Sequence, residues 1–210
     1  MSYKFICIEG NIGVGKTTLV KKLVKHLRAH SLLEEFDENP WLPLFYLHPK
    51  ESALALELSF LTDRCRQLNQ IQEKFAKETI VSDYSLDKCL LFAQANLTKA
   101  DFATYRKLYG RISTTIKKPD LVVVLHTSVE VLMCNIKTRG RTYEQSIEKE
   151  YLAKLNKAYT GFFSKEKDYV ILNINCKTID AKNYTHIFNE IVSFLKIKHS
   201  NKNTTININI

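Results

Sequence analysis

The sequence predicts an α/β domain in which a five-stranded parallel sheet lies between two layers of helices. Five short apolar runs, suited to buried strands, alternate with longer segments whose apolar residues recur at helical spacing. A glycine-rich loop separates the first run from the first helical segment. Strands that alternate with helices form parallel sheets covered on both faces. With 210 residues, the chain is long enough for one such domain.

The elements follow one another in a regular order along the chain. We expect strands at residues 4–8 (KFICI), 32–36 (LLEEF), 79–83 (TIVSD), 120–126 (DLVVVLH) and 169–174 (YVILNI). We expect helices at 17–29, 50–77, about 85–116, 128–138, 147–164 and 183–197. Residues 1–198 then form a single domain, and the polar residues 199–210 are expected to be a disordered, frayed tail. Since ligands bind beyond the carboxyl ends of parallel strands, functional residues are expected in the loops that follow the strands.

The loop after the first strand carries the clearest chemical signal. Residues 10–17 read GNIGVGKT, a complete G-x-x-x-x-G-K-[ST] phosphate loop. In this motif backbone N–H groups surround the phosphates, Lys16 reaches the β and γ oxygens, and the Thr17 hydroxyl ligates Mg²⁺. The helix that follows points its N-terminus at the phosphates; the alternative is a plain glycine-rich turn. We expect a nucleoside triphosphate with Mg²⁺, its phosphates contacting Gly10, Asn11, Ile12, Gly13, Val14, Gly15, Lys16, Thr17 and Thr18.

Composition narrows the possible partners and compartment. No apolar run approaches the ~20 residues that span a bilayer, and the first strand begins too early for a signal peptide, so no membrane partner is expected. Five scattered cysteines without a C-x-x-C pair indicate reduced thiols in a cytoplasmic protein. The net charge is +9, which a triphosphate site also requires. No nucleic-acid motif is present, so we do not expect DNA or RNA as the primary ligand.

Charged residues follow three of the predicted strands or helices. Glu34 and Glu35 end the second strand, where a carboxylate is a candidate general base; an acidic turn that caps the next helix is the alternative. Asp83 ends the third strand and is placed to help hold Mg²⁺ or the acceptor. Arg139 and Arg141 flank a glycine, a pattern suited to a mobile lid over transferring phosphate; a solvated basic turn is the alternative.

Taken in order, these segments resemble the deoxynucleoside kinase family, in its bacterial deoxyadenosine/deoxyguanosine kinase branch. The similarity runs from Lys4 to about Leu195. It rests on GNIGVGKTTL, DENPWLPLFY, FLTDR, SDYSLDKCLLFA and TRGRTYEQ. The resemblance implies a three-layer P-loop kinase fold with a small arginine-containing lid and a homodimer formed through the helices of residues 50–116. It also implies ATP-dependent phosphorylation of the 5′-hydroxyl of a purine deoxynucleoside in nucleotide salvage.

The resemblance also implies roles for individual residues. Glu34 matches the catalytic base, with Glu35 as the alternative one position along. Lys16, Arg139 and Arg141 match the groups that neutralise the transferring phosphoryl. The remaining substrate contacts are Tyr46 and Glu144 on the sugar 3′-hydroxyl, Glu57 and Arg64 on the base, and Asp83 as the acid of the D/E-R-S motif. Four residues depart from the family pattern, namely Tyr84 and Asn135 in place of arginines, Cys89 in place of an aspartate and Glu57 in place of the usual glutamine.

The base preference is predicted from one pair. Glu57 and Arg64 lie seven residues apart on an expected helix, so both side chains share one face. Arg64 offers donors to purine N7 and O6, whereas an ionised Glu57 only accepts and suits the N–H groups of guanine or adenine. An ion pair that serves only the fold is the alternative. The choice between deoxyadenosine and deoxyguanosine stays open.

Two other functions remain as alternatives. A nucleoside monophosphate kinase of the thymidylate kinase type shares the loop and the lid, but its acceptor carries a phosphate and should meet arginine where this chain has Glu34 and Tyr84. A non-catalytic P-loop module would need a residue that positions water, and none is evident.

Overall fold

The structure, a computed structural model, describes residues 3–36, 38–177, 181–197 and 204–208. The described strands form one parallel sheet in the order β2-β3-β1-β4-β5-β6. They are β1 (Phe5–Gly10), β2 (His30–Leu32), β3 (Ile80–Ser82), β4 (Leu121–His126), β5 (Val170–Cys176) and β6 (Thr204–Ile208). From β1 the chain passes to β2, which lies beyond β3, and then returns through β3 to the side of β1. It later continues at β4, which pairs with the other edge of β1. The reversal of strand order therefore lies beside β1.

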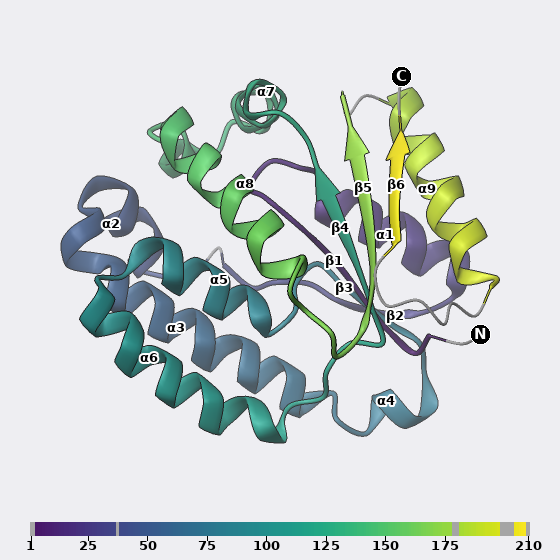
Figure 1. The fold of residues 1–210 in the computed structure, drawn as a ribbon, viewed down its shortest axis with the longest axis horizontal. Coiled ribbons are helices and arrows are strands. Elements are labelled where there is room, and N and C mark those ends of the chain that lie inside the picture. The colour runs from purple at the N-terminus through teal and green to yellow at the C-terminus, as the bar shows by residue number, and fades with distance from the viewer. Residues whose placement is uncertain (1–2, 37, 178–180, 198–203, 209–210) are drawn as a thin grey trace.

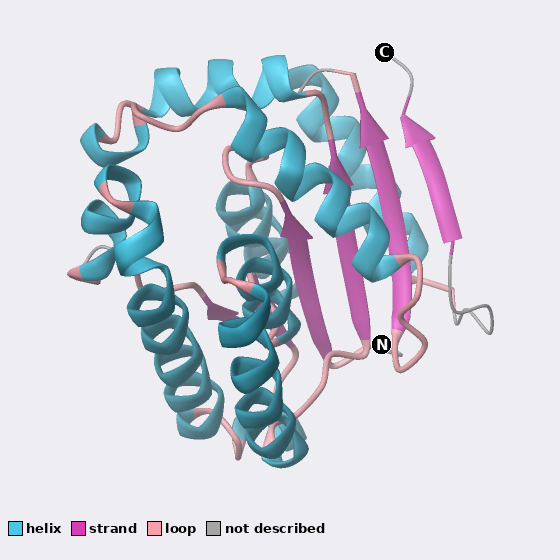
Figure 2. Cartoon of the chain, turned by 60° about the vertical axis from the view of Figure 1, so that its left-hand side comes forward, coloured by secondary structure: helices cyan, strands magenta, loops and turns pink. Residues whose placement is uncertain are grey.

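Helices cover both faces of this sheet (Figures 1 and 2). They are α1 (Lys16–Leu27), α2 (Trp41–Leu47), α3 (Pro49–Gln70), α4 (Lys74–Lys77), α5 (Asp87–Asn96), α6 (Lys99–Ile112), α7 (Val129–Arg139), α8 (Lys149–Phe163) and α9 (Ala181–Leu195). Short 3-10 turns occupy Ser113–Thr115 and Thr142–Glu144. Figure 1 shows α1 and α9 on one side of the sheet and α3, α5 and α6 on the other.

Successive residues of β1 point into two separate cores, as the period-two geometry of a strand requires. Ile6 and Ile8 belong to the cluster shared with α1 and α9. Phe5 and Cys7 belong to the cluster shared with α3, α5 and α8. A central strand that is buried on both faces reads as a continuous apolar run, and this explains why the sequence pattern identified it.

Two predicted strand assignments need correction. The strand expected at 32–36 is instead β2, residues 30–32. Its partner β3 ends at Ser82, which pairs with Leu32, so later residues have no strand to pair with. Residues 33–36 form a loop. The frayed tail expected at 199–210 is wrong for residues 204–208, which form a sixth strand, β6, parallel to β5. The remaining residues of that segment, 199–203 and 209–210, lie outside the described residues.

Two predicted helices are divided. The helix expected at 50–77 is split into α3 and α4, and a further helix, α2, precedes it. The stretch from 85 to 116 becomes α5 and α6. Thr98 caps the second of these helices by accepting a hydrogen bond from the Asp101 N–H at 3.2 Å, which satisfies an otherwise unpaired helix donor.

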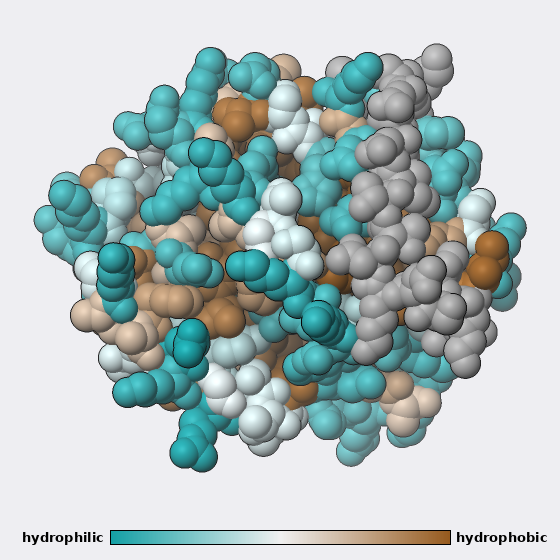
Figure 3. All heavy atoms as spheres, in the orientation of Figure 1, coloured by the Kyte–Doolittle hydropathy of each residue, from teal (hydrophilic) through white to brown (hydrophobic). Residues whose placement is uncertain are grey.

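The surface carries no sign of a membrane span. No helix in the described part of the chain is long and apolar enough to cross a bilayer. Hydrophilic side chains are spread over the face shown in Figure 3.

The central strand should dominate stability. We expect Ile6→Ala to lower the free energy of unfolding by about 2–5 kcal/mol, because it removes a fully buried side chain from the core. Urea unfolding monitored by circular dichroism measures this loss. Ile197→Ala is the matched control, since that side chain is 61% exposed and should change stability by less than about 0.5 kcal/mol. Equal losses in the two variants would contradict the placement of β1 at the core.

Candidate active site

The phosphate loop connects β1 to α1 and curls through two glycines in left-handed geometry. Gly13 has φ of 81° and Gly15 of 91°, a region that side chains other than glycine rarely adopt. The Lys16 ammonium donates to the carbonyls of Gly10 at 2.8 Å and Asn11 at 3.0 Å. Burial, together with the nearby positive charge of Lys88, lowers the pKa of Lys16 to about 8. The loop thus presents backbone amides and a partly buried cation to an anion.

Side chains from distant elements hold this loop in place. Asn11 donates to the carbonyl of Leu152 at 2.8 Å and to the side chain of Asn156 at 2.8 Å, both on α8. Asn135 on α7 donates to the Gly13 carbonyl at 2.9 Å. At this position, where the sequence departs from the family pattern, the amide supports the phosphate loop. Among the expected loop contacts, Thr18 is exposed, outside the curl.

Asp83 joins the ends of three strands. Its Oδ2 accepts a hydrogen bond from the Thr17 hydroxyl at 2.5 Å, and its Oδ1 accepts one from the Glu34 N–H at 2.8 Å. The carboxylate is buried, with 3% of the residue exposed. One side chain at the end of β3 therefore positions both the phosphate loop after β1 and the acidic loop after β2.

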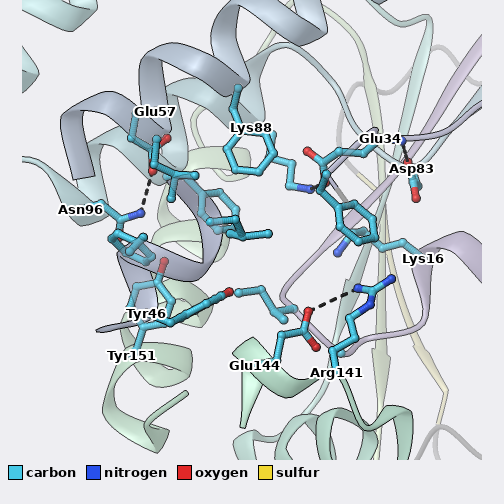
Figure 4. A pocket seen from close by; sticks show the side chains of 18 of the residues that line it. Lys16, Glu34, Tyr46, Glu57, Asp83, Lys88, Asn96, Arg141, Glu144 and Tyr151 are labelled. Atoms are coloured by element: carbon cyan, nitrogen blue, oxygen red, sulfur yellow. Dashed lines mark hydrogen bonds and ion pairs between the residues drawn. The ribbon is translucent and has the colours of Figure 1, made fainter. Parts of the chain in front are cut away.

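A pocket lies over these strand ends and is lined by residues of the phosphate loop, the loop after β2, α3, α5 and the lid. Figure 4 shows side chains from the phosphate loop, α3, α5, the lid and α8 facing it. Its polar lining consists of Lys16, Thr17, Glu34, Tyr46, Glu57, Arg64, Asp83, Lys88, Asn96, Arg139, Arg141, Glu144 and Tyr151. Aromatic rings of Phe36, Phe45, Phe60 and Phe92 complete the walls.

Glu34 lies at the centre of a buried charge cluster. Arg64 donates to Glu34 Oε1 through Nε at 2.9 Å and also through Nη2, and Lys88 donates to Oε2 at 2.6 Å. Burial alone would raise the pKa of this carboxyl. The charges of Arg64 and Lys88 outweigh burial and hold the pKa of Glu34 far below its usual value. Glu34 is therefore an ionised acceptor at neutral pH.

Arg64 and Glu57 both line the pocket but do not pair with each other among the described contacts. The Arg64 guanidinium is committed to Glu34 and donates to Cys89 Sγ at 2.9 Å, and it stacks 4.9 Å from the centre of the Phe60 ring. The alternative of a Glu57–Arg64 ion pair that serves only the fold is therefore wrong.

Glu57 instead pairs with an amide. Asn96 at the end of α5 donates to Glu57 Oε1 at 2.7 Å, while Oε2 is buried and has no hydrogen-bond partner among the residues that the structure describes. Burial raises the pKa of Glu57 to about 7, although the Asn96 hydrogen bond lowers it. A buried carboxylate oxygen without a partner is costly, so this corner is suited to a ligand that donates a hydrogen bond.

The lid lies between α7 and α8. Arg139 donates to Glu144 Oε2 through Nε at 3.0 Å, and Arg141 donates to Glu144 Oε1 at 3.3 Å. The Arg141 guanidinium also lies 4.2 Å from the centre of the Phe36 ring. Gly140, with φ of 72°, ends α7 and turns the chain into the lid. Both arginines face the pocket while they remain anchored by one carboxylate.

Most of the expected site residues therefore meet in one pocket, although they come from segments far apart in the sequence. Glu35, the alternative base, does not; it lies on the surface and pairs with Arg66 at 3.4 Å. Sequence reasoning missed Lys88 and Asn96. Lys88 could have been found, because it lies only four residues after Tyr84, where a cation was expected. Asn96 has no recognisable pattern around it.

Comparisons with known proteins agree with this geometry. The model of the family described as deoxynucleoside kinase matches residues 6–197. The chain is 34% identical over 157 residues to a deoxyguanosine kinase of Bacillus subtilis, covering 74% of this chain and 76% of that protein. It is 33% identical over 190 residues to a deoxyadenosine kinase of Lactobacillus acidophilus, covering 83% and 86%.

A solved structure agrees in fold. The deoxyadenosine kinase from M. mycoides with bound dATP superposes with a TM-score of 0.80 at 27% identity, covering 91% of this chain and 98% of that one. With its phosphate loop, buried acidic pocket and arginine lid in the arrangement described above, this chain belongs to the deoxynucleoside kinase family.

Proposed function

We propose that this kinase transfers the γ-phosphoryl group of ATP to the 5′-hydroxyl of a purine deoxynucleoside, deoxyadenosine or deoxyguanosine. The observation that carries the proposal is the placement of an ionised carboxylate, Glu34, in the same pocket as the phosphate loop. Relatives named deoxyguanosine kinase and deoxyadenosine kinase support a purine acceptor. The dATP in the M. mycoides enzyme supports a nucleoside triphosphate ligand.

The charges of the pocket favour an uncharged acceptor. Arg64 and Lys88 are bound to Glu34, and the two lid arginines are bound to Glu144. An acceptor that carries its own phosphate would need cations to bind that phosphate, whereas these four are already bound to carboxylates. A nucleoside, with only hydroxyls to place, has no such need, and this favours a nucleoside kinase over a nucleoside monophosphate kinase.

The mechanism relies on position and charge. Phosphoryl transfer proceeds through a loose transition state with little covalent help from the protein. Glu34 accepts a hydrogen bond from the 5′-hydroxyl, orients it toward the γ phosphorus and takes its proton as the new P–O bond forms. Lys16 and the lid arginines stabilise the charge on the transferring group.

Thr17 and Asp83 suit Mg²⁺. Their oxygens lie 2.5 Å apart and are the hard ligands that Mg²⁺ prefers. Mg²⁺ is usually held by one or two protein ligands together with substrate phosphates, and Thr17 and Asp83 would supply the protein ligands here. When bound, the ion neutralises the β and γ oxygens.

We also place the enzyme in the cytoplasm and expect it to act as a homodimer. The five cysteines are free, as expected in a reducing compartment. Leu54 on α3 and Leu108 on α6 are 40% and 43% exposed, so the two long helices offer apolar surface to a second copy.

Glu34→Gln should reduce kcat by about 100 to 10,000-fold, because the amide keeps the shape but cannot take a proton. Steady-state assays with deoxyguanosine and ATP measure this loss, while calorimetry and the unfolding midpoint separate it from lost binding or folding. Glu35→Gln is the matched control and should stay close to wild type, because Glu35 is exposed and pairs with Arg66 on the surface. The large loss in Glu35→Gln instead would assign the base to that residue.

Arg141→Ala and Arg139→Ala should each lower kcat by about 100-fold and change deoxynucleoside Kd much less, since the lid acts on the transferring group. Arg66→Ala, which removes an exposed arginine with its own acidic partners, controls for the general loss of positive charge. Unchanged turnover at saturation, together with weakened nucleoside binding, would show that the lid binds substrate and takes no part in transfer.

Base choice should follow Glu57. We expect wild-type enzyme to prefer deoxyadenosine and deoxyguanosine over deoxycytidine and thymidine in kcat/KM by about 100-fold, because a pyrimidine leaves buried polar groups unpaired. Glu57→Gln, which can also donate, should narrow that ratio. A panel of the four deoxynucleosides on both proteins measures it.

The pKa of Glu57, about 7, adds an internal control. Above that pH the carboxylate is ionised and only accepts, whereas below it the protonated form also donates. The purine preference of wild type should therefore be larger at about pH 8 than at about pH 6, and that of Glu57→Gln should not change. A wild type that prefers pyrimidines, or a variant with an unaltered ranking, contradicts the role of Glu57.

A further inference from the structure

The N-terminal turn of α5 supplies a buried ammonium to the reacting end of the pocket. Lys88 is the second residue of α5, and only 7% of its side chain is exposed. Its ammonium donates to Glu34 Oε2 at 2.6 Å and lies 5.7 Å from the centre of the Phe92 ring. Figure 4 shows the side chain directed across the pocket toward Glu34, on the side where Lys16 lies.

Lys88 has hydrogen-bonding capacity left over. An ammonium carries three N–H donors, and in the described part of the chain Glu34 is the one hydrogen-bond acceptor of this ammonium. Lys88 lines the pocket, so the remaining N–H donors of its ammonium border space that is open to a ligand. Tyr84, four residues earlier, does not compete for this position, because its hydroxyl is directed to Gln67 Oε1 at 2.7 Å.

Lys88 is not needed to neutralise the charge of Glu34. Arg64 already neutralises Glu34 by donating two N–H groups to Oε1. The charges of Glu34, Arg64 and Lys88 sum to +1, and the buried Glu9 carboxyl also lies within electrostatic reach of Lys88 and Lys16. Lys88 also acts on Lys16, whose pKa its charge lowers in addition to the effect of burial. Two neighbouring ammonium groups repel each other when the pocket is empty, and an anion between them removes that cost.

We propose that Lys88 is a catalytic residue whose ammonium bridges Glu34 and the non-bridging oxygens of the phosphoryl group in transit, opposite Lys16. The proposal rests on the proposed function. The 5′-oxygen forms the new bond to the γ phosphorus and the bond to the β–γ bridging oxygen breaks. The hydroxyl proton passes to Glu34, and the electron pair leaves with the diphosphate. The Lys88 ammonium donates hydrogen bonds to the oxygens on which charge accumulates.

Substitution separates this role from a structural one. Lys88→Met keeps the length of the side chain and removes the charge, and Lys88→Arg keeps the charge. We expect Lys88→Met to lower kcat with deoxyguanosine by about 100-fold or more, with deoxyguanosine Kd changed by less than about threefold. Lys88→Arg should recover part of the loss. Lys118→Met is the matched control, because Lys118 forms an exposed ion pair with Asp168 and should leave kcat unchanged.

The decisive readout is the ratio of kcat with ATP to kcat with ATPγS, which replaces a γ non-bridging oxygen by sulfur. If Lys88 contacts that oxygen, Lys88→Met loses much of the wild-type ratio, because the contact that distinguishes oxygen from sulfur has gone. A side chain that only supports the fold would lower both rates equally and leave the ratio unchanged, which overturns the proposal. If Lys88→Met does not fold, Lys88→Gln, which keeps a neutral donor, is judged by the same ratio.

The two hypotheses can fail separately. A wild-type enzyme that phosphorylates deoxyguanosine, beside a Lys88→Met variant with unaltered kcat, overturns the role of Lys88 and leaves the function standing. A wild-type enzyme that phosphorylates no deoxynucleoside overturns both.

Discussion

The ionised carboxylate of Glu34, held by two cations in a buried pocket, is the interaction on which the remainder of the site depends. A lone carboxylate in this position would be strongly destabilised and would take up a proton. Arg64 from α3 and Lys88 from α5 keep it charged, so two helices that also meet through the hydrogen bond from Arg64 to Cys89 Sγ converge on one side chain. Removing either cation would leave the Glu34 carboxylate incompletely paired, which is unfavourable in a buried site. The ion pairs therefore connect α3 and α5, which line the acceptor end of the pocket, to the loop after β2, which lies beside the phosphate loop.

The topology of the sheet makes that convergence possible. The phosphate loop, Glu34 and Asp83 follow β1, β2 and β3, whose carboxyl ends lie side by side because the strands are parallel and run in the order β2-β3-β1. Asp83 then fixes the spacing through hydrogen bonds to Thr17 and to the Glu34 backbone. Donor and acceptor ends of the pocket are thereby set by short contacts within a rigid sheet edge. The two lid arginines are held by Glu144, and Arg141 also by the Phe36 ring, while the lid residue Tyr143 stacks on Tyr46 with the ring centres 6.3 Å apart.

The sequence predicted the parts of the fold that periodicity and motifs encode. Central strands such as β4 are continuous apolar runs, and the phosphate loop is defined by its own chemistry. The edge of the sheet was harder, because β2 has only three residues and β6 alternates isoleucine with asparagine in a polar context. Side-chain pairing was hardest. Helical spacing put Glu57 and Arg64 on one face, but only the packed structure shows that Arg64 turns to Glu34 and that Asn96 takes its place beside Glu57.

The central claim is that this pocket, in which Glu34 and Glu144 are each paired with two cations, accepts the hydroxyl of a nucleoside and does not accept an acceptor that carries a phosphate. The most direct test supplies deoxyguanosine and dGMP together, at equal concentration, with ATP and Mg²⁺, and follows every nucleotide by chromatography. The account predicts that deoxyguanosine is consumed, that dGMP and ADP accumulate in equal amounts, and that no dGDP forms. Conversion of dGMP to dGDP, with deoxyguanosine left untouched, would contradict it.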